Sequence, residues 1–100
     1  MKFNLLVRPE VDTDLLEAEG WYEKQRIGLG RDFLHAAREK MAALPHNPFL
    51  HRIRHHRRQV RWAYPGHFPY RIIFRVVGDT VVVYAVLHAA RRDTHWKRRL

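Results

Sequence analysis

The stretch FPYRIIFRVVGDTVVVYAVLHAARRDTHW, residues 68–96, contains the two segments that decide the fold. Tyr70–Val77 and Thr80–His88 are rich in β-branched and aromatic residues, and the Gly-Asp pair between them is typical of a hairpin turn. The second segment is apolar on both faces, which indicates a central strand. The stretch ends in HAARRDTHW, residues 88–96, which is either a working site or the place where a small basic domain stops.

Alternation assigns the strand residues to two faces of a sheet. In residues 70–77 every second residue is predicted to face the core, namely Tyr70, Ile72, Phe74 and Val76. In residues 59–64, QVRWAY, the same spacing assigns three residues to the core face, namely Val60, Trp62 and Tyr64. Residues between them should face away from it. We therefore expect an open, cationic face of the sheet that carries Arg61, Arg71 and Arg75.

Two amphipathic helices precede these strands, the first over residues 10–25 and the second over residues 31–44. The first has apolar residues at helical spacing: Val11, Leu15, Ala18 and Tyr22. The second has another such stripe: Phe33, Leu34, Ala37, Met41 and Leu44. The loop IGLG, residues 27–30, is expected to use the positive φ available to both glycines. So short a loop requires the helices to pack as an antiparallel hairpin.

The order of elements predicts an α+β fold in a single domain spanning residues 1–100. Phe3–Arg8 reads as an N-terminal strand, and residues 49–58 are either a loop or a ragged strand. The expected architecture is β-α-α-β-β-β, a mainly antiparallel sheet with the helix hairpin packed on one face.

The charge is distributed unevenly along the chain. Residues 1–44 carry a net charge of −1, whereas residues 45–100 carry +10 and hold seven of the eight histidines. Fifteen of the nineteen cationic residues are arginines, whose planar guanidinium suits phosphate and carboxylate groups. We therefore expect a polyanion or an acidic protein segment as a partner.

Several classes of protein are disfavoured. The chain has no cysteine, so disulfides and thiol catalysis are excluded. No apolar stretch is long enough for a membrane span and no signal peptide is recognisable, so we expect a cytoplasmic protein without membrane contact. His51, His55 and His56 lie near one another in sequence, but the adjacent arginines oppose a divalent cation. We expect neither a metal nor a cofactor.

The polar end of the opening stretch supplies the candidate functional residues. His88, Arg71, Arg75 and Arg91 could support metal-free cleavage of a phosphodiester, with the imidazole as base or acid and the arginines stabilising negative charge. Alternatively, His88 is a strand-end residue bonded to a turn. Trp96 is expected to hold the tail over the sheet edge, with base stacking as the alternative. The candidate binding residues are Arg61, Arg71, Arg75, Arg91, Arg92 and Trp96.

The motifs WYE-x-Q-x-x-GLG-x-x-F, FPY-x-I and VLH-x-x-R-x-x-x-x-W occur in this order from Trp21 to Trp96. Their combination resembles the RelE/ParE superfamily of toxins from type II toxin–antitoxin systems, over a region from about Val7 to Trp96. The resemblance implies a β-α-α-β-β-β fold and a growth-inhibiting toxin neutralised by a cognate antitoxin, which often wraps an acidic segment around it.

The superfamily contains two kinds of effector. RelE-type members cut mRNA on the ribosome, and Arg71 falls where they place a sheet arginine, with His88 near their C-terminal functional residues. ParE-type members inhibit DNA gyrase by binding it, and the helix-hairpin signature and the VLH-x-x-R-x-D ending look more like this branch. The resemblance therefore favours a ParE-like gyrase inhibitor. The alternatives are a ribosome-dependent mRNA endoribonuclease and a non-toxic basic RNA-binding module.

Overall fold

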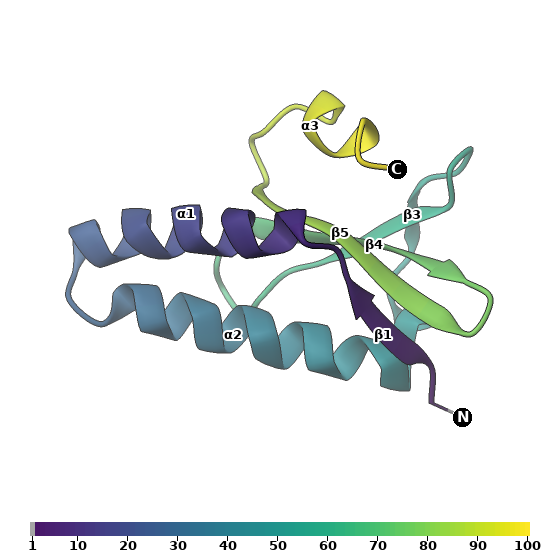
Figure 1. The fold of residues 1–100 in the computed structure, drawn as a ribbon, viewed down its shortest axis with the longest axis horizontal. Helices are drawn as coiled ribbons and strands as arrows, with labels where there is room; N and C mark the ends of the chain where they lie inside the picture. The colour runs from purple at the N-terminus through teal and green to yellow at the C-terminus, as the bar shows by residue number, and fades with distance from the viewer. Residues whose placement is uncertain (1) are drawn as a thin grey trace.

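The computed structural model describes residues 2–100 and has an α+β architecture, as predicted. Two long helices cover one face of a five-stranded sheet of order β1-β5-β4-β3-β2, and a short helix lies on the other side (Figure 1). The elements are β1 (Asn4–Val7), α1 (Glu10–Gln25), α2 (Leu29–Ala43), β2 (Ile53–His55), β3 (Val60–Ala63), β4 (Tyr70–Val77), β5 (Thr80–His88) and α3 (Thr94–Lys97).

The sheet is antiparallel except at one edge. β1 pairs in parallel with β5, with Asn4 opposite Thr80 and Val7 opposite Val83. β5 therefore lies between β1 and β4, which explains why its sequence is apolar on both faces. Residues 49–58, for which the sequence allowed a loop or a strand, form a 3₁₀ turn (Pro48–Leu50) and the short edge strand β2.

The two glycines of the helix–helix loop serve different purposes. Gly28 has φ +88° and precedes α2, where the Glu23 carboxylate accepts hydrogen bonds from the backbone N–H groups of Gly28 (3.0 Å) and Gly30 (3.1 Å). The expectation of a positive φ at Gly30 is wrong, because this residue lies within α2. A Cβ there would be 2.7 Å from the Glu19 backbone oxygen, so Gly30 is needed for the close approach of the two helices.

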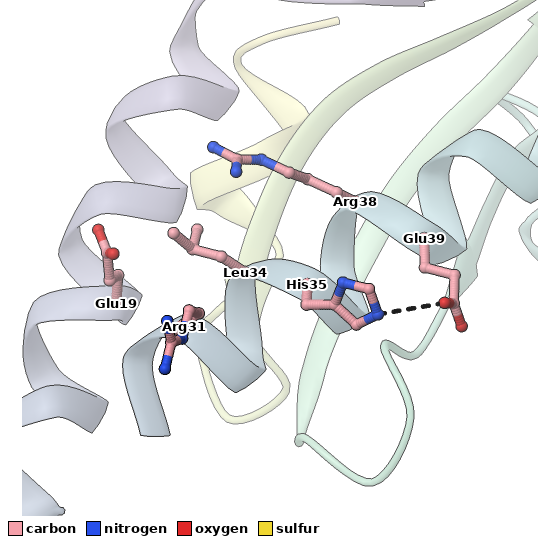
Figure 2. Close-up of a pocket in the computed structure, with 6 residues that line it drawn as sticks. All are labelled: Glu19, Arg31, Leu34, His35, Arg38 and Glu39. Carbon is pink, nitrogen blue, oxygen red and sulfur yellow. Dashed lines mark ion pairs between the residues drawn. The ribbon is translucent and has the colours of Figure 1, made fainter. Parts of the chain in front are cut away.

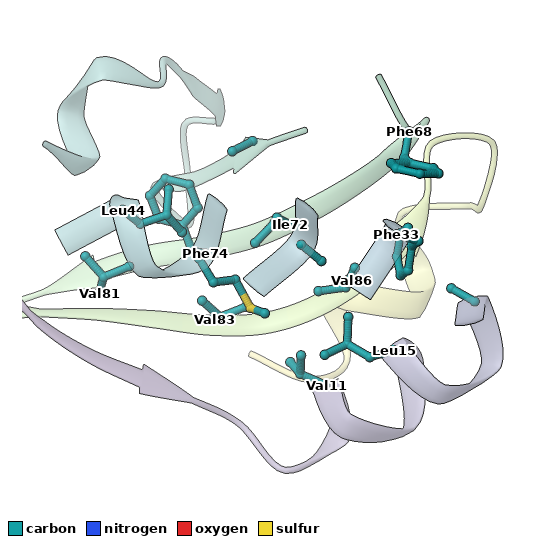
Figure 3. Packing of buried hydrophobic residues seen from close by; sticks show 14 of the residues in the cluster. Val11, Leu15, Phe33, Leu44, Phe68, Ile72, Phe74, Val81, Val83 and Val86 are labelled. Atoms are coloured by element: carbon teal, nitrogen blue, oxygen red, sulfur yellow. The ribbon is translucent and has the colours of Figure 1, made fainter. Parts of the chain in front are cut away.

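The helix-side core lies between the sheet and the α1–α2 hairpin (Figure 3). The predicted stripe of α1 is buried, and Phe33 of α2 packs against Tyr22 and Phe68 with ring centroids 5.3 Å away in each case. The sheet contributes Ile72, Phe74, Val81, Val83 and Val86. Burial of this apolar surface provides the main stabilisation of the hairpin on the sheet.

A β-bulge changes which side chains of β5 face the helices. Ile73 is opposite Ala85 but Phe74 is opposite Val83, so Tyr84 is an extra residue in β5. Val83 and Val86, three positions apart, consequently both lie in the helix-side core. Simple alternation along β5 could not have assigned these faces.

The other face of the sheet has a second core, formed by Val60, Ile73, Ala85, Leu87 and Trp96, with Trp62 packed against it. The prediction that Val60 and Trp62 face the helices is therefore wrong. In β3, Ala63 enters the helix-side core, whereas Val60 and Trp62 lie on the other face of the strand, which α3 covers.

Arg61 is also on the opposite side from the one predicted. It pairs with Phe74 on β4 and lies two positions before Ala63, so it faces the same side of the sheet as both. Phe74 and Ala63 belong to the helix-side core. Its guanidinium donates a 2.6 Å hydrogen bond to the His51 carbonyl and lies 5.0 Å from the Phe49 ring centroid. Arg61 thus braces the segment before β2, and the face opposite the long helices carries Arg71 and Arg75 without it.

Candidate functional site at the end of β5

The segment after β5 folds back over the sheet face that the long helices leave uncovered (Figure 1). Trp96 of α3 is only 1% exposed and packs into the second core. The Asp93 carboxylate accepts hydrogen bonds from Trp96 Nε1 (3.3 Å) and from Arg71 Nη1 (3.2 Å). Trp96 therefore holds the chain over the sheet face, not the edge as expected. A ring so deeply buried has no surface left for a base or a protein partner, so its predicted binding role is not supported.

The two predicted arginines of β4 lie on this same face. The Arg71 guanidinium is 4.5 Å from the Trp62 ring centroid, and Arg54 is 5.3 Å from the same ring. Arg71 is thus held between a ring and a carboxylate. Arg75 lies two positions after Ile73 and therefore on the same face of the sheet, and its Nε is buried. Neither arginine lines the pocket beside His88.

His88 is held by the turn that follows β5. The Ala90 backbone N–H donates a 3.0 Å hydrogen bond to His88 Nδ1, and the Arg91 N–H donates to the His88 carbonyl at 2.9 Å. Because Nδ1 accepts a hydrogen bond, the neutral ring carries its proton on Nε2. Neither ring nitrogen is then free to abstract a proton.

A small pocket adjoins His88. It has a volume of about 40 Å³ and is lined by residues that include Tyr70, His88 and Arg91, with Glu17 from α1. This space suits a water molecule but not a nucleotide, whose sites are usually several hundred Å³. Burial raises the pKa of Tyr70, which Arg91 partly offsets and Glu17 reinforces, so its hydroxyl remains protonated at neutral pH.

The remaining cations of this segment are near its surface. Arg91 Nη2 donates to His95 Nδ1 at 3.2 Å, and Arg98 Nη2 contacts the same nitrogen at 3.4 Å. Partial desolvation and then the charges of the neighbouring arginines lower the pKa of His95. Arg92 is exposed.

An ion pair that the sequence analysis missed ties this segment to α1. Asp14 is buried, and its carboxylate accepts bonds from Arg99 Nη1 (2.6 Å), Arg99 Nη2 (3.0 Å) and the Val86 N–H (2.9 Å). Arg99 also donates to the Tyr84 carbonyl at the bulge, at 3.2 Å. One signal was present in the sequence, since Asp14 lies between Val11 and Ala18 within the apolar stripe.

A second concave surface lies on the outside of the helix hairpin. We call it the hairpin groove. It has a volume of about 700 Å³ and is lined by Glu19, Arg31, Leu34, His35, Arg38 and Glu39 (Figure 2). His35 and Glu39 form an exposed ion pair at 3.4 Å. Adjoining hollows extend the groove to Leu16 and Ile27, which are 67% and 90% exposed.

Two further properties concern the described part of the chain. Within residues 2–100, no group of three or more His, Asp or Glu side chains is arranged to hold a metal ion. None of the helices there is both long and apolar enough to cross a membrane.

Comparisons with known proteins identify the family. The sequence matches the family model of the ParE toxin of the type II toxin–antitoxin system parDE over residues 5–93. A solved structure described as the chromosomal ParDE TA system from P. aeruginosa has the same fold, with a TM-score of 0.71 and 14% identity. The match covers 87% of this chain and 96% of that one. No curated protein matched the sequence significantly. The chain therefore belongs to the ParE toxin family of type II toxin–antitoxin systems.

Proposed function

We propose that this toxin inhibits growth by binding DNA gyrase in the cytoplasm, and that a cognate antitoxin neutralises it. The observation that carries the choice of mechanism is the state of His88. Its Nδ1 accepts the Ala90 N–H, and the pocket beside it has room for water alone. This arrangement favours a toxin that acts by binding over one that cleaves RNA.

The alternative, an mRNA endoribonuclease, requires a base, an acid and cations around one phosphate. Here His88 and Arg91 line one pocket, whereas Arg71 is engaged by Asp93 and Trp62 on the sheet face. Tyr70, which also lines this pocket, has a raised pKa and is a poor base. The groups of a nuclease are therefore not assembled around a common point.

The turn before α3 is the proposed contact with gyrase. Arg91 and Arg92 are exposed there, and the turn is held by hydrogen bonds from Ala90 to His88 and from Trp96 to Asp93. A preordered cationic turn loses little conformational entropy when a partner binds it. Such a turn suits an acidic surface of the target.

The hairpin groove is the proposed site for the antitoxin. Leu34 and the exposed Leu16 offer apolar surface, while Arg31 and Arg38 supply two cations to a groove that Glu19 and Glu39 also line. An amphipathic, acidic antitoxin segment could place its apolar side in the groove and its carboxylates against the arginines. Helix α3, which follows the β5–α3 turn, lies on the other side of the sheet (Figure 1).

A pair of variants tests both assignments. Arg92→Ala should weaken inhibition of supercoiling by purified gyrase while antitoxin binding persists. Arg31→Ala with Arg38→Ala should weaken antitoxin binding while gyrase inhibition persists. Unimpaired supercoiling with the parent toxin, together with codon-phased mRNA breaks on induction, would replace gyrase inhibition by ribosome-dependent cleavage. Harmless expression would instead favour a non-toxic RNA-binding module.

A further inference from the structure

The most strongly charged segment of the chain has no role in the function proposed above. Residues 51–58, HRIRHHRR, contain four arginines and three histidines but no Asp or Glu. They form β2 and the turn between β2 and β3, and this turn projects beyond the rest of the sheet (Figure 1). All four arginines are exposed: Arg52, Arg54, Arg57 and Arg58. None of them forms an ion pair within residues 2–100.

The second half of the chain offers little negative charge to these arginines. Residues 45–100 contain just two acidic residues, Asp79 and Asp93. Asp93 binds Arg71 and Trp96, and Asp79 lies in the β4–β5 turn, where it accepts a hydrogen bond from Thr80. The positive charge of the β2–β3 turn is therefore not neutralised within the fold, and it can attract an anion from outside.

The turn itself is ordered by hydrogen bonds that leave its arginine side chains free. The Arg58 N–H donates to His55 Nδ1 at 3.3 Å, and the Gln59 side-chain amide donates to the His56 carbonyl at 2.8 Å. Gln59 has φ +57°, which completes the tight reversal. The guanidinium groups of Arg57 and Arg58 are thus presented from a structured tip.

Helix α3 extends this charged region. The centroids of the His55 and Trp96 rings are 5.8 Å apart, so the β2–β3 hairpin and α3 are neighbours on the same side of the sheet. The exposed Lys97 and Arg98 of this segment add two more cations. We call the combined region the hairpin–α3 surface and define it by Arg54, Arg57, Arg58, Lys97 and Arg98.

The aromatic rings of this region indicate which anion it suits. Arg54 and Arg71 both lie over Trp62, and Trp96 is buried, so neither tryptophan offers a free face to a nucleic-acid base. Single-strand binders normally stack bases on exposed rings, whereas duplex binding rests on phosphate contacts. An amphipathic acidic peptide needs apolar surface to bury, but here that surface is already covered by α3.

We infer that the hairpin–α3 surface binds the phosphate backbone of duplex DNA, without reading its sequence. Duplex DNA carries about one negative charge per 1.7 Å of its axis, so closely spaced arginines can neutralise several phosphates and release their counterions. This activity is separate from gyrase inhibition. It would hold the toxin near the nucleic acid on which a DNA-processing target works.

The experiment measures fluorescence anisotropy of a labelled duplex of about 20 base pairs with the full chain, from about 50 to 200 mM salt. The plot of log affinity against log salt should be linear with a negative slope. Arg57→Gln with Arg58→Gln should reduce the magnitude of that slope by about 1.8, since each lost phosphate contact removes about 0.9. Circular dichroism should be unchanged because both side chains are exposed and form no ion pair with any of residues 2–100.

The matched control is Arg31→Gln with Arg38→Gln, which removes the same charge from the opposite side of the molecule. It should leave the slope nearly unchanged. If both double variants reduce the slope equally, binding reflects diffuse charge and the inference is overturned. It is also overturned if the parent chain does not bind the duplex, or if single-stranded DNA or RNA of equal length binds more tightly. A duplex-binding defect with intact gyrase inhibition would separate this surface from the proposed target site.

Discussion

Removing the Arg99 side chain should destabilise the protein far more than its position near residue 100 suggests. The substitution Arg99→Met keeps the aliphatic part of the side chain but deletes two hydrogen bonds to Asp14, of 2.6 and 3.0 Å, and one to the Tyr84 carbonyl. The Asp14 carboxylate, whose side chain is 4% exposed, would retain the Val86 N–H as its partner.

The expected cost follows from this geometry. Removing one partner of a buried ion pair costs about 3–5 kcal/mol, because the other charge stays buried without compensation. Arg99 is 23% exposed, so water can partly replace it, and we expect a loss of about 2–4 kcal/mol. For a domain of this size such a loss corresponds to a fall in Tm of roughly 10–20 °C.

The assay is urea unfolding followed by far-UV circular dichroism, with the neighbouring Arg98→Met as matched control. Arg98 has no carboxylate partner in the described residues, so its substitution should cost about 0.5 kcal/mol or less. A double-mutant cycle with Asp14→Asn should show a coupling energy of about 1.5 kcal/mol or more. Equal losses for the two arginine variants, or strictly additive losses in the cycle, would refute the reasoning.

Three further predictions concern stability. Gly30→Ala should destabilise the fold because its Cβ would be 2.7 Å from a backbone oxygen. Gly20→Ala, whose Cβ would have nothing within 4 Å, should stabilise the fold by about 0.5–1 kcal/mol. Urea unfolding compares the two variants, and similar effects would contradict the close approach of the helices at Gly30. Trp96→Ala should cost about 3–5 kcal/mol by emptying the second core, and a loss below about 1 kcal/mol would contradict its packing role. Burial, and then nearby cations, lowers the pKa of His51 below its usual 6.5. The unfolded chain consequently binds more protons as pH falls through about 6.5, so stability should decrease from about pH 7.5 to about pH 5.5, and less so in His51→Gln. An identical pH profile in that variant would exclude His51 as the cause.

Much of the fold was predictable because it follows from local periodicity. Helix α1 occupies the expected residues 10–25, and the β4–β5 hairpin lies where the alternating segments and the Gly-Asp turn indicated. Such patterns arise from the 3.6-residue period of a helix and the two-residue period of a strand, which depend on backbone geometry alone. The family resemblance and the order of elements pointed to the same architecture.

The candidate site was less predictable. Arg71 and Arg75 are on the expected face, but Arg61 and Trp62 are each on the face opposite to the predicted one. Both residues belong to the four-residue strand β3, which has apolar side chains on both of its faces. The pattern within β3 could not indicate which phase faces the helices, because a distant segment, α3, covers the other side.

The sequence by itself determined the family, the helix hairpin, the central strands and the cationic second half of the chain. Tertiary structure alone decided that Trp96 completes a second core, that Asp14 and Arg99 meet across 85 positions of sequence, and that His88 Nδ1 accepts a backbone hydrogen bond. The physical reason is the distance along the chain over which each kind of interaction acts. Periodicity reflects the position of a residue relative to its neighbours within one helix or strand. The burial of a side chain, its ion pairs and its hydrogen bonds depend instead on which distant segment of the chain packs against it.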